Sequence, residues 1–399
     1  MQDNVTTQGE DTAKLLPCSF SGEMVWPAPV RALAVTVGKF LSHANCETVR
    51  ACIDAVANEC DMGRRPVAFR SNESGGFSLD RLVVLRTLGK GGFSRVRLVM
   101  SPDHAGVYAL KCCLKSKIER LKQTTHIKHE RDIVATLDFP FILRMHATFQ
   151  DKQHVYMLFE AVMGGELYSV LERQGSLDPG AARFYAGCLV AVFEHLHQRR
   201  IVYRDLKPEN VMIDEHGYPK LIDFGFAKVL HESTRSKCGT PEYVAPEILM
   251  GRGYLWSVDW WCVGVLVYEM LFGATPFQAE EEMDLYKLII SNDPEVADKT
   301  PDGQAVPTDC KGAIHALLIK EPDKRLGKRS SEHDEVRAHP WFQGVDFEEL
   351  LARRIPAPWK PRLASAVDTS NFDEYDEELL DAAADDDADA QPSAIEWDF

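Results

Sequence analysis

The stretch Y-R-D-L-K-P-E-N, residues 203–210, places three polar groups at a spacing that suits the transfer of a phosphoryl group. Asp205 can accept or orient the proton of an attacking hydroxyl, and Lys207 can screen charge on the moving group. Asn210 offers an amide oxygen to a magnesium ion. Phosphoryl transfer depends mainly on positioning and charge neutralisation, so these are the residue types that the chemistry requires. Each residue alone would ordinarily be a turn or surface residue, so the prediction depends on the motifs around the stretch.

Two motifs follow downstream. D-F-G, residues 223–225, comes after a predicted short hairpin, and the Asp223 carboxylate is the hard oxygen ligand that magnesium prefers. A-P-E, residues 245–247, closes the next segment. A buried Glu247 needs a cation, and Arg325 is its expected partner in a structural ion pair.

A glycine-rich segment lies upstream. G-K-G-G-F-S-R-V, residues 89–96, supplies backbone N–H groups that can approach phosphate oxygens. The dinucleotide fingerprint resembles it but opens a helix, whereas residues 95–99 have the pattern of a strand. Ser94 stands where a third glycine is usual. Lys111, at the end of the next strand, can neutralise phosphates, and Glu130 can pair with it.

The order of predicted elements indicates an α+β fold with two lobes, a small antiparallel β-rich lobe and a larger helical one. Apolar residues repeat with helical spacing between 185 and 196, and Pro179 suits a first helical turn. Strands are expected at 82–99, 108–111 and 155–160, one helix at 126–137, and mainly helices from the helix that Pro179 begins to residue 342.

The domain boundaries follow from the same patterns. We expect an N-terminal extension at 1–78, partly helical or disordered, with short helices within 30–57 and a linker at 71–76. The folded domain is expected at 79–342, with lobes at 79–160 and 163–342, and a tail at 343–399. The tail has an acidic run that predicts a solvated segment.

Composition narrows the classes of partner. The chain of 399 residues is 45% hydrophobic and has a formal net charge of −16, which suits basic peptides and argues against nucleic acid. None of the ten cysteines forms a C-x-x-C pair, which argues against zinc, and no secretory signal is visible, so we expect reduced thiols and a cytoplasmic location. The apolar stretch 258–272 is shorter than the roughly 20 residues of a membrane span, so we expect a buried helix.

The combined motifs resemble the eukaryotic protein kinases over residues 79–399. Tyr203 and the segments 224–228, 238–243 and 259–261 are similar to the AGC group, and 368–375 resembles its cyclic-nucleotide-dependent branch. Residues 156–161 and the W-D-F ending look like the cyclic-GMP-dependent kinases. We recognise no cyclic-nucleotide-binding domain in the sequence, and in this domain organisation the chain instead resembles the catalytic subunits of the cyclic-AMP-dependent kinases. That resemblance implies a separate regulatory subunit.

The resemblance also implies roles for individual residues. Phe159 would be the gatekeeper beside the adenine, and Thr240 would join Asp205, Lys207, Lys111 and Glu130 in catalysis. The residues implied to bind ATP are Leu88, Gly89, Gly91, Gly92, Phe93, Ser94, Val96, Ala109, Lys111, Glu160, Val162, Glu166 and Met212. Those implied to bind substrate are Glu166, Glu209, Glu269, Lys237, Pro241 and Val244, the first three by selecting arginines upstream of the acceptor.

Two positions in the segment after 225 are notable within the resemblance. Ser236 aligns with the activation-loop phosphosite, where a phosphate could pair with Arg204, Lys228 and His126. Lys237 departs from the apolar residue usual there, so the residue after the acceptor could be acidic or polar. In the tail, Phe372 and Tyr375 are expected near the ATP mouth, and Trp397 and Phe399 against the small lobe.

The sequence therefore predicts a serine/threonine protein kinase that uses ATP and magnesium on basic protein segments. A pseudokinase that binds ATP and partners without turnover is the alternative, and loss of Lys111, Asp205, Asn210 or Asp223 would favour it; all four are present. A dinucleotide-dependent enzyme is excluded because the predicted order of strands contains no βαβ unit.

Overall fold

The computed structural model describes residues 73–74, 76–101, 104, 106–328, 335–377, 397 and 399. They form two compact units: the first contains the residues up to 124, 145–163 and the tail from 363, and the second contains 125–144 and 164–362. Most of the predicted N-terminal extension and of the acidic run lies outside the described residues. The α+β class is confirmed, because strands dominate the first unit and helices the second.

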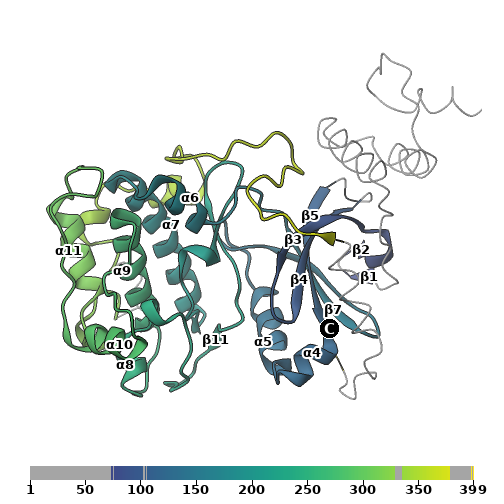
Figure 1. The fold of residues 1–399 in the computed structure, drawn as a ribbon, viewed down its shortest axis with the longest axis horizontal. Helices are drawn as coiled ribbons and strands as arrows, with labels where there is room; N and C mark the ends of the chain where they lie inside the picture. The colour runs from purple at the N-terminus through teal and green to yellow at the C-terminus, as the bar shows by residue number, and fades with distance from the viewer. Residues whose placement is uncertain are drawn as a thin grey trace, which may run out of the picture. The chain divides into compact units, whose positions relative to one another are not determined.

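The first unit is built on a five-stranded antiparallel sheet, drawn in Figure 1. The strand order is β3-β4-β5-β7-β6, so β3 and β6 are the edges. Short connections join β3 to β4, β4 to β5 and β6 to β7, as expected for hairpins, whereas two helices separate β5 from β6 in the chain and β7 lies between these strands in the sheet. The strands are β3 (Val83–Lys90), β4 (Ser94–Ser101), β5 (Gly106–Leu114), β6 (Met145–Gln150) and β7 (His154–Glu160).

A small hairpin precedes this sheet where the sequence predicted a linker. Glu73–Ser74 (β1) pairs with Phe77–Ser78 (β2), and Gly76 turns the chain between them with φ +82°. Phe77 and Leu79 are buried in a core with Phe149 and Leu158. The hydrophobic anchor Phe77 therefore gives the residues just before 79 a place in the fold.

A second core of the first unit includes part of the C-terminal tail. Leu363, Val367 and Phe372 pack against the buried cluster of Leu85, Leu88, Leu98, Met100 and Met163. Asn371 also donates a hydrogen bond of 3.1 Å to the backbone oxygen of Met163. The tail thus completes the small unit by covering apolar side chains of its sheet.

The last aromatic residues contact other parts of the first unit. Trp397 is 7% exposed, and its indole N–H donates to Glu119 on α4 (Lys115–Arg120) at 3.1 Å. Gln150 donates to the backbone oxygen of Trp397 at 2.8 Å. Figure 1 marks this end of the chain beside α4 and β7.

Helix α9 (Ser257–Phe272) is the centre of the second unit and packs against α7 (Pro179–Gln198) and α11 (Thr308–Leu317). Most of its side chains are apolar and buried, as expected of a helix inside a large core. Gly264 permits the close approach to α11, because a Cβ there would lie 2.8 Å from that of Leu317. Other helices of this unit are α5 (Thr124–Val134), α6 (Leu167–Gln174), α8 (Pro246–Leu249), α10 (Glu282–Ser291) and α12 (Phe347–Leu351).

The start of α7 follows from its local sequence. Pro179 occupies the first turn, and the Asp178 carboxylate accepts hydrogen bonds from the backbone N–H groups of Gly180 and Ala181 at 2.8 and 3.0 Å. This satisfies donors that have no partner inside the helix. None of the described helices has both the length and the apolar character needed to cross a bilayer.

Two short strand pairs support the loops that carry the polar motifs. β9 (Val211–Ile213) pairs with β10 (Pro219–Leu221), which is the hairpin expected before Asp223. β8 (Ile201–Val202) pairs with β11 (Lys228–Val229). The segments 203–210 and 222–227 are thereby fixed at both ends.

Glu247 and Arg325 form a fully buried ion pair in the second unit. The two guanidinium nitrogens lie 2.7 and 2.9 Å from the two carboxylate oxygens, and both side chains are 0% exposed. Arg325 also donates to the backbone oxygens of Ile319 and Ser257. The pair joins α8 to the segment that follows α11.

Candidate active site

The carboxylate of Asp205 is the centre of a hydrogen-bonded cluster in the second unit. Its Oδ1 accepts from the Thr240 hydroxyl at 3.2 Å, and its Oδ2 accepts from the Asn210 amide at 2.9 Å. The ammonium of Lys207 lies 3.5 Å from Oδ2 and donates to the Thr240 hydroxyl at 3.1 Å. Four residues from two separate motifs are therefore in direct contact.

A buried aspartate holds the backbone of this loop. Asp259, on α9 and 0% exposed, accepts from the backbone N–H groups of Tyr203 at 3.0 Å and Arg204 at 2.8 Å. His197 lies 2.8 Å from the same carboxylate. Arg204 has φ +73°, a left-handed conformation that costs energy for a residue with a Cβ. Asp259 therefore stabilises a strained turn next to Asp205.

Sequence analysis missed this role of Asp259. In the sequence, Asp259 supported only the group resemblance, as part of the segment 259–261. A carboxylate in an otherwise apolar helix was the available signal, because a buried charge requires donors. The sequence alone did not show that those donors lie 55 residues away, in the loop before Asp205.

Burial raises the pKa of Asp205, and the nearby negative charge of Asp223 raises it further. Lys207, Asn210 and Thr240 act in the opposite direction, because a cation and hydrogen-bond donors favour the carboxylate. The net shift is upward. A carboxylate with a raised pKa binds a proton more readily than an ordinary aspartate, which suits a group that receives one.

Asp223 and Asn210 offer oxygen atoms suited to a divalent metal ion. The side-chain amide nitrogen of Asn210 donates to the backbone oxygen and to Oδ2 of Asp205, and the amide oxygen takes part in neither bond. Asp223 is exposed and has φ +52°, and its Oδ1 accepts from the Gly225 N–H at 3.1 Å. The residues fit an ion that takes few protein oxygens and fills its other positions with phosphate and water. Among the described residues, no three His, Cys, Asp or Glu side chains gather as a metal cluster.

The predicted nucleotide-binding residues belong to both units. The glycine segment joins β3 and β4, where the Gly91 N–H donates to the Ser94 backbone oxygen at 2.8 Å and closes the turn. Leu88, Val96 and Ala109 belong to one apolar cluster, which Phe372 of the tail also contacts. Lys111 lies on β5, between Val96 of β4 and Met157 of β7. The first unit contains Leu88, Gly89, Gly91, Gly92, Phe93, Ser94, Val96, Ala109, Lys111, Glu160 and Val162, and the second contains Glu130, Glu166 and Met212.

The segment around Ser236 lies close to basic side chains. Ser236 is exposed, and its hydroxyl lies 3.2 Å from that of Thr234, which accepts from Lys228 at 3.4 Å. Tyr254 donates to the Ser236 backbone oxygen at 2.6 Å, and Arg204 donates to the Tyr254 hydroxyl at 3.3 Å. Two of the three predicted phosphate partners are thus linked to Ser236, Lys228 through Thr234 and Arg204 through Tyr254. The third, His126, lies on α5.

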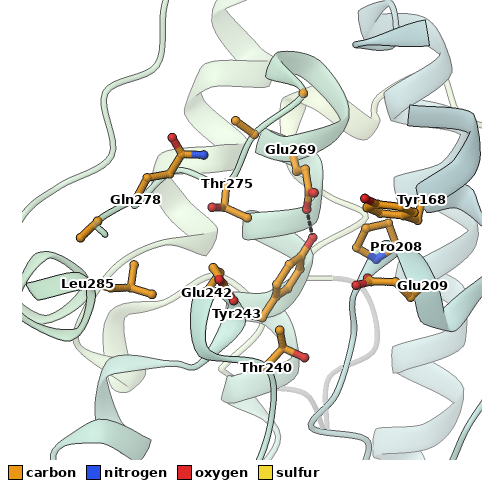
Figure 2. A pocket seen from close by; sticks show the side chains of 13 residues that line it. Tyr168, Pro208, Glu209, Thr240, Glu242, Tyr243, Glu269, Thr275, Gln278 and Leu285 are labelled. Atoms are coloured by element: carbon orange, nitrogen blue, oxygen red, sulfur yellow. Dashed lines mark hydrogen bonds between the residues drawn. The ribbon is translucent and has the colours of Figure 1, made fainter. Parts of the chain in front are cut away.

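A pocket of about 480 Å³ lies beside the Asp205 cluster in the second unit (Figure 2). Thr240, which contacts Asp205, is part of its wall. Three carboxylates line it: Glu209, Glu242 and Glu269. The remaining lining residues are Tyr168, Pro208, Tyr243, Gly273, Ala274, Thr275, Gln278, Ala279 and Leu285.

The carboxylates of this pocket influence one another. Burial raises the pKa of Glu269, and the charges of Glu209 and Glu242 add to the rise. The Tyr243 hydroxyl donates a hydrogen bond to Glu269, as the dashed line in Figure 2 shows, and this bond lowers the pKa of Glu269 and so offsets part of the rise. Such a group of like charges is stabilised when a cation enters the pocket.

The pocket differs from the predicted set of substrate residues. Glu209 and Glu269 line it, whereas Glu166 directly precedes α6 and its backbone forms an isolated bridge with Met212. Glu242 was not predicted, although it lies within the segment 238–243, two residues after Thr240. Sequence analysis also missed Tyr168, which is 43% exposed.

The remaining predicted substrate residues lie on the segment that leads to Thr240 and beyond. Lys237 is exposed, Pro241 begins a 3₁₀ turn (Pro241–Tyr243), and Val244 is buried. Gly239 has φ +108°, and a Cβ there would lie 3.0 Å from the backbone oxygen of Arg204. The glycine therefore lets this segment approach the Asp205 loop.

Comparison with known proteins agrees with this geometry. A protein kinase domain model matches residues 82–342. The cAMP-dependent protein kinase type 3 of Saccharomyces cerevisiae is 40% identical over 82% of this chain and 80% of its own length. The cGMP-dependent protein kinase 2 of Homo sapiens is 40% identical over 74% of this chain and 38% of its own length. The cAMP-dependent protein kinase catalytic subunit of Dictyostelium discoideum is 38% identical over 74% of this chain and 45% of its own length. The match thus spans less than half of the two longer relatives.

Proposed function

Since this chain belongs to the protein kinase family and is a serine/threonine protein kinase, we propose that it phosphorylates segments with arginine upstream of the acceptor. The observation that carries this proposal is the shared position of Thr240. Its hydroxyl contacts Asp205, and its side chain lines the pocket of three carboxylates. A substrate that places its hydroxyl at Asp205 therefore has an acidic pocket within reach of its neighbouring residues.

The chemistry assigned to the Asp205 cluster is direct transfer. The substrate oxygen forms a bond to the γ-phosphorus of ATP, the bond from that phosphorus to the bridging oxygen breaks, and ADP leaves. Asp205 orients the hydroxyl and accepts its proton, which its raised pKa favours. Lys207 lies close enough to the same carboxylate to offset charge that builds on the transferred group. Thr240 keeps both side chains in position.

ATP and a divalent metal ion are general requirements of the family, and we propose that the ion is Mg²⁺. Asn210 and Asp223 would hold it through oxygen atoms, which matches the preference of this hard cation. When bound, the ion neutralises phosphate charge. The chain's own contribution is the placement of the two ligands, because the amide of Asn210 is oriented by Asp205 and the Asp223 carboxylate by the Gly225 N–H.

Arginine fits the acidic pocket better than lysine does. A planar guanidinium has five N–H donors and can engage more than one carboxylate at once. Glu209 and Glu269, with Glu242 beside them, would supply those acceptors. Lys237, exposed on the segment before Thr240, favours an acidic or polar residue after the acceptor.

Two proposals concern the regulation of transfer. We infer that Ser236 is the activating phosphosite, because hydrogen bonds connect it to Lys228 by way of Thr234 and to Arg204 by way of Tyr254.

We also infer a separate regulatory subunit that binds a cyclic nucleotide, since one relative is a catalytic subunit by name. A purified cyclic-AMP-binding regulatory subunit should inhibit transfer until cyclic AMP is added. Inhibition that cyclic nucleotide cannot relieve, or no inhibition, would contradict this inference.

A cytoplasmic location is the companion proposal. All six described cysteines are free thiols, which suits a reducing compartment. Fractionation of cells that express the chain would test it, and recovery in a secreted or membrane fraction would contradict it.

The experiment that tests the proposed function is a transfer assay with radiolabelled ATP and Mg²⁺. An arginine-rich serine peptide is compared with the same peptide carrying alanine in place of the arginines, for the wild type and for Asp205→Asn. Label on the arginine peptide that is lost in the variant would support both the reaction and the preference. ATP binding without transfer, even after Ser236 has been phosphorylated in vitro, would favour the pseudokinase alternative.

A further inference from the structure

We propose that Glu377 is a positioning residue for the nucleotide, because its carboxylate clamps Thr87, two residues before the glycine segment. The inference rests on the proposed role of that segment in ATP binding. Thr87 lies on β3 and Glu377 on the tail, 290 residues further along the chain, and both belong to the first unit.

Both carboxylate oxygens of Glu377 accept hydrogen bonds from Thr87. The backbone N–H of Thr87 donates to Oε1 of Glu377 at 2.6 Å, and its hydroxyl donates to Oε2 at 2.9 Å. Thr87 is 1% exposed, so neither donor could be satisfied by bulk water. β3 is an edge strand, and an N–H on its outer side has no strand to pair with. Glu377 supplies that missing acceptor.

A second tail residue binds the preceding position of β3. The guanidinium of Arg86 donates to the Thr369 hydroxyl at 2.6 Å, and Thr369 is buried. The β3–β4 pairing is irregular on both sides of this point, between Val84 and Arg86 and again between Thr87 and Gly89. Irregular pairing weakens the control that one strand has over its neighbour. The tail contacts therefore lie where β4 alone holds β3 least firmly.

The clamp acts on the segment that follows. Leu88 is the next residue and packs in the apolar cluster with Val96 and Ala109. Beyond it, a Cβ at Gly89 or Gly92 would meet nothing within 4 Å, so no other described part of the chain packs against these two glycines. A shift of Thr87 would move the N–H groups proposed to meet phosphate, and ATP affinity should fall while transfer from bound ATP continues.

The test is steady-state kinetics of Glu377→Ala on the full chain. We expect KM for ATP to rise about tenfold, since two hydrogen bonds to a charged group are lost. We expect kcat and KM for the peptide to change less than twofold. Thr87→Val, which keeps the N–H bond, should raise KM for ATP by about threefold, and adding it to Glu377→Ala should have little further effect because the partners are coupled. Glu377→Gln should remain near wild type, because its amide oxygen can accept from the N–H and its amide nitrogen can donate to the hydroxyl oxygen.

Glu374→Ala is the matched control, because it removes an exposed acid three residues away in the same tail. An equal rise of KM in Glu374→Ala would show a general effect of tail charge and overturn the clamp, as would an unchanged KM in Glu377→Ala. Hydrogen exchange gives a readout besides turnover: the amide of Thr87 should exchange faster in Glu377→Ala than in Glu374→Ala. The same assay tests the proposed function separately, because the wild type should transfer phosphate and Asp205→Asn should not. A failure of the clamp proposal can therefore be distinguished from a failure of the proposed function.

Discussion

The hydroxyl of Thr240 lies 3.2 Å from Oδ1 of Asp205 and 3.1 Å from the ammonium of Lys207. It donates to the first and accepts from the second, so one hydroxyl joins a carboxylate and a cation that approach each other no closer than 3.5 Å. The relative position of these two charged groups therefore depends on a residue from a different motif.

Thr240→Val should lower kcat by about 10- to 100-fold, because Asp205 loses a donor and Lys207 an acceptor at the site of proton transfer. Thr240→Ser keeps the hydroxyl and should retain most of the activity. Steady-state kinetics with saturating ATP would measure both variants. Equal loss in the two variants would indicate that packing of the methyl group, and not the hydroxyl, matters at this position.

The preference for arginine should weaken as the pH falls. The pKa of Glu269 is raised, so this carboxylate loses its charge at a higher pH than an ordinary glutamate. The neutral form attracts a guanidinium less, so KM for an arginine peptide should rise with acidification. Glu269→Gln should raise KM about tenfold at neutral pH and flatten that dependence. A peptide without arginine is the control, and a parallel pH response in that peptide would place the titrating group elsewhere.

Ser236→Ala should lower activity by about tenfold or more, because a phosphate could no longer link this segment to the Lys228 and Arg204 side chains. Activity would be compared after treatment of both proteins with a phosphatase. The two should then become equal, since the wild type loses the same group. Full activity of Ser236→Ala before treatment would show that the segment orders without a phosphate.

Lys320 should reduce stability at neutral pH. Its ammonium has no hydrogen-bond partner among the described residues and lies 4.1 and 4.9 Å from the ring centroids of Phe277 and Trp261. Burial, with a smaller contribution from Arg325, lowers its pKa to about 8, which Asp293 partly opposes. Between that value and its ordinary pKa the unfolded chain binds more protons, so this residue makes stability rise with pH.

Lys320→Met should therefore increase the free energy of unfolding at pH 7 by about 1 kcal/mol, a value reduced for the partial exposure of the lysine. The advantage should shrink as the pH approaches 10. Urea unfolding at both pH values would measure it. Lys324→Met, an exposed lysine nearby, should change stability by less than about 0.5 kcal/mol. A Lys320→Met variant that is less stable than the wild type would mean that the contacts of the cation with the two rings outweigh its burial.

The sequence was informative where motif spacing and chemistry coincide. Asp205 and Asn210 lie five residues apart in one short loop, so local geometry already brings them together. The long helices were also predictable: the helical spacing of apolar residues at 185–196 is a strong signal, and this segment lies within α7.

Contacts between distant segments were not predictable in the same way. Asp259 contacts a backbone N–H 55 residues away, and Glu377 contacts Thr87 across 290 residues. No spacing rule relates such positions, since they meet only after the sheet and the helices have packed. Glu242 was missed for another reason, because a single acid beside a turn ordinarily faces solvent, and only the pocket brings it together with Glu209 and Glu269.

The buried pair of Glu247 and Arg325 limits how this chain could change over generations. Loss of either partner would leave an unmatched charge without water, at a cost of about 3–5 kcal/mol, which is a large part of a typical domain's stability. Replacement of both by well-packed apolar residues could cost almost nothing. Two acceptable sequences are thus separated by single-substitution intermediates that would scarcely fold, so drift one residue at a time should keep both partners.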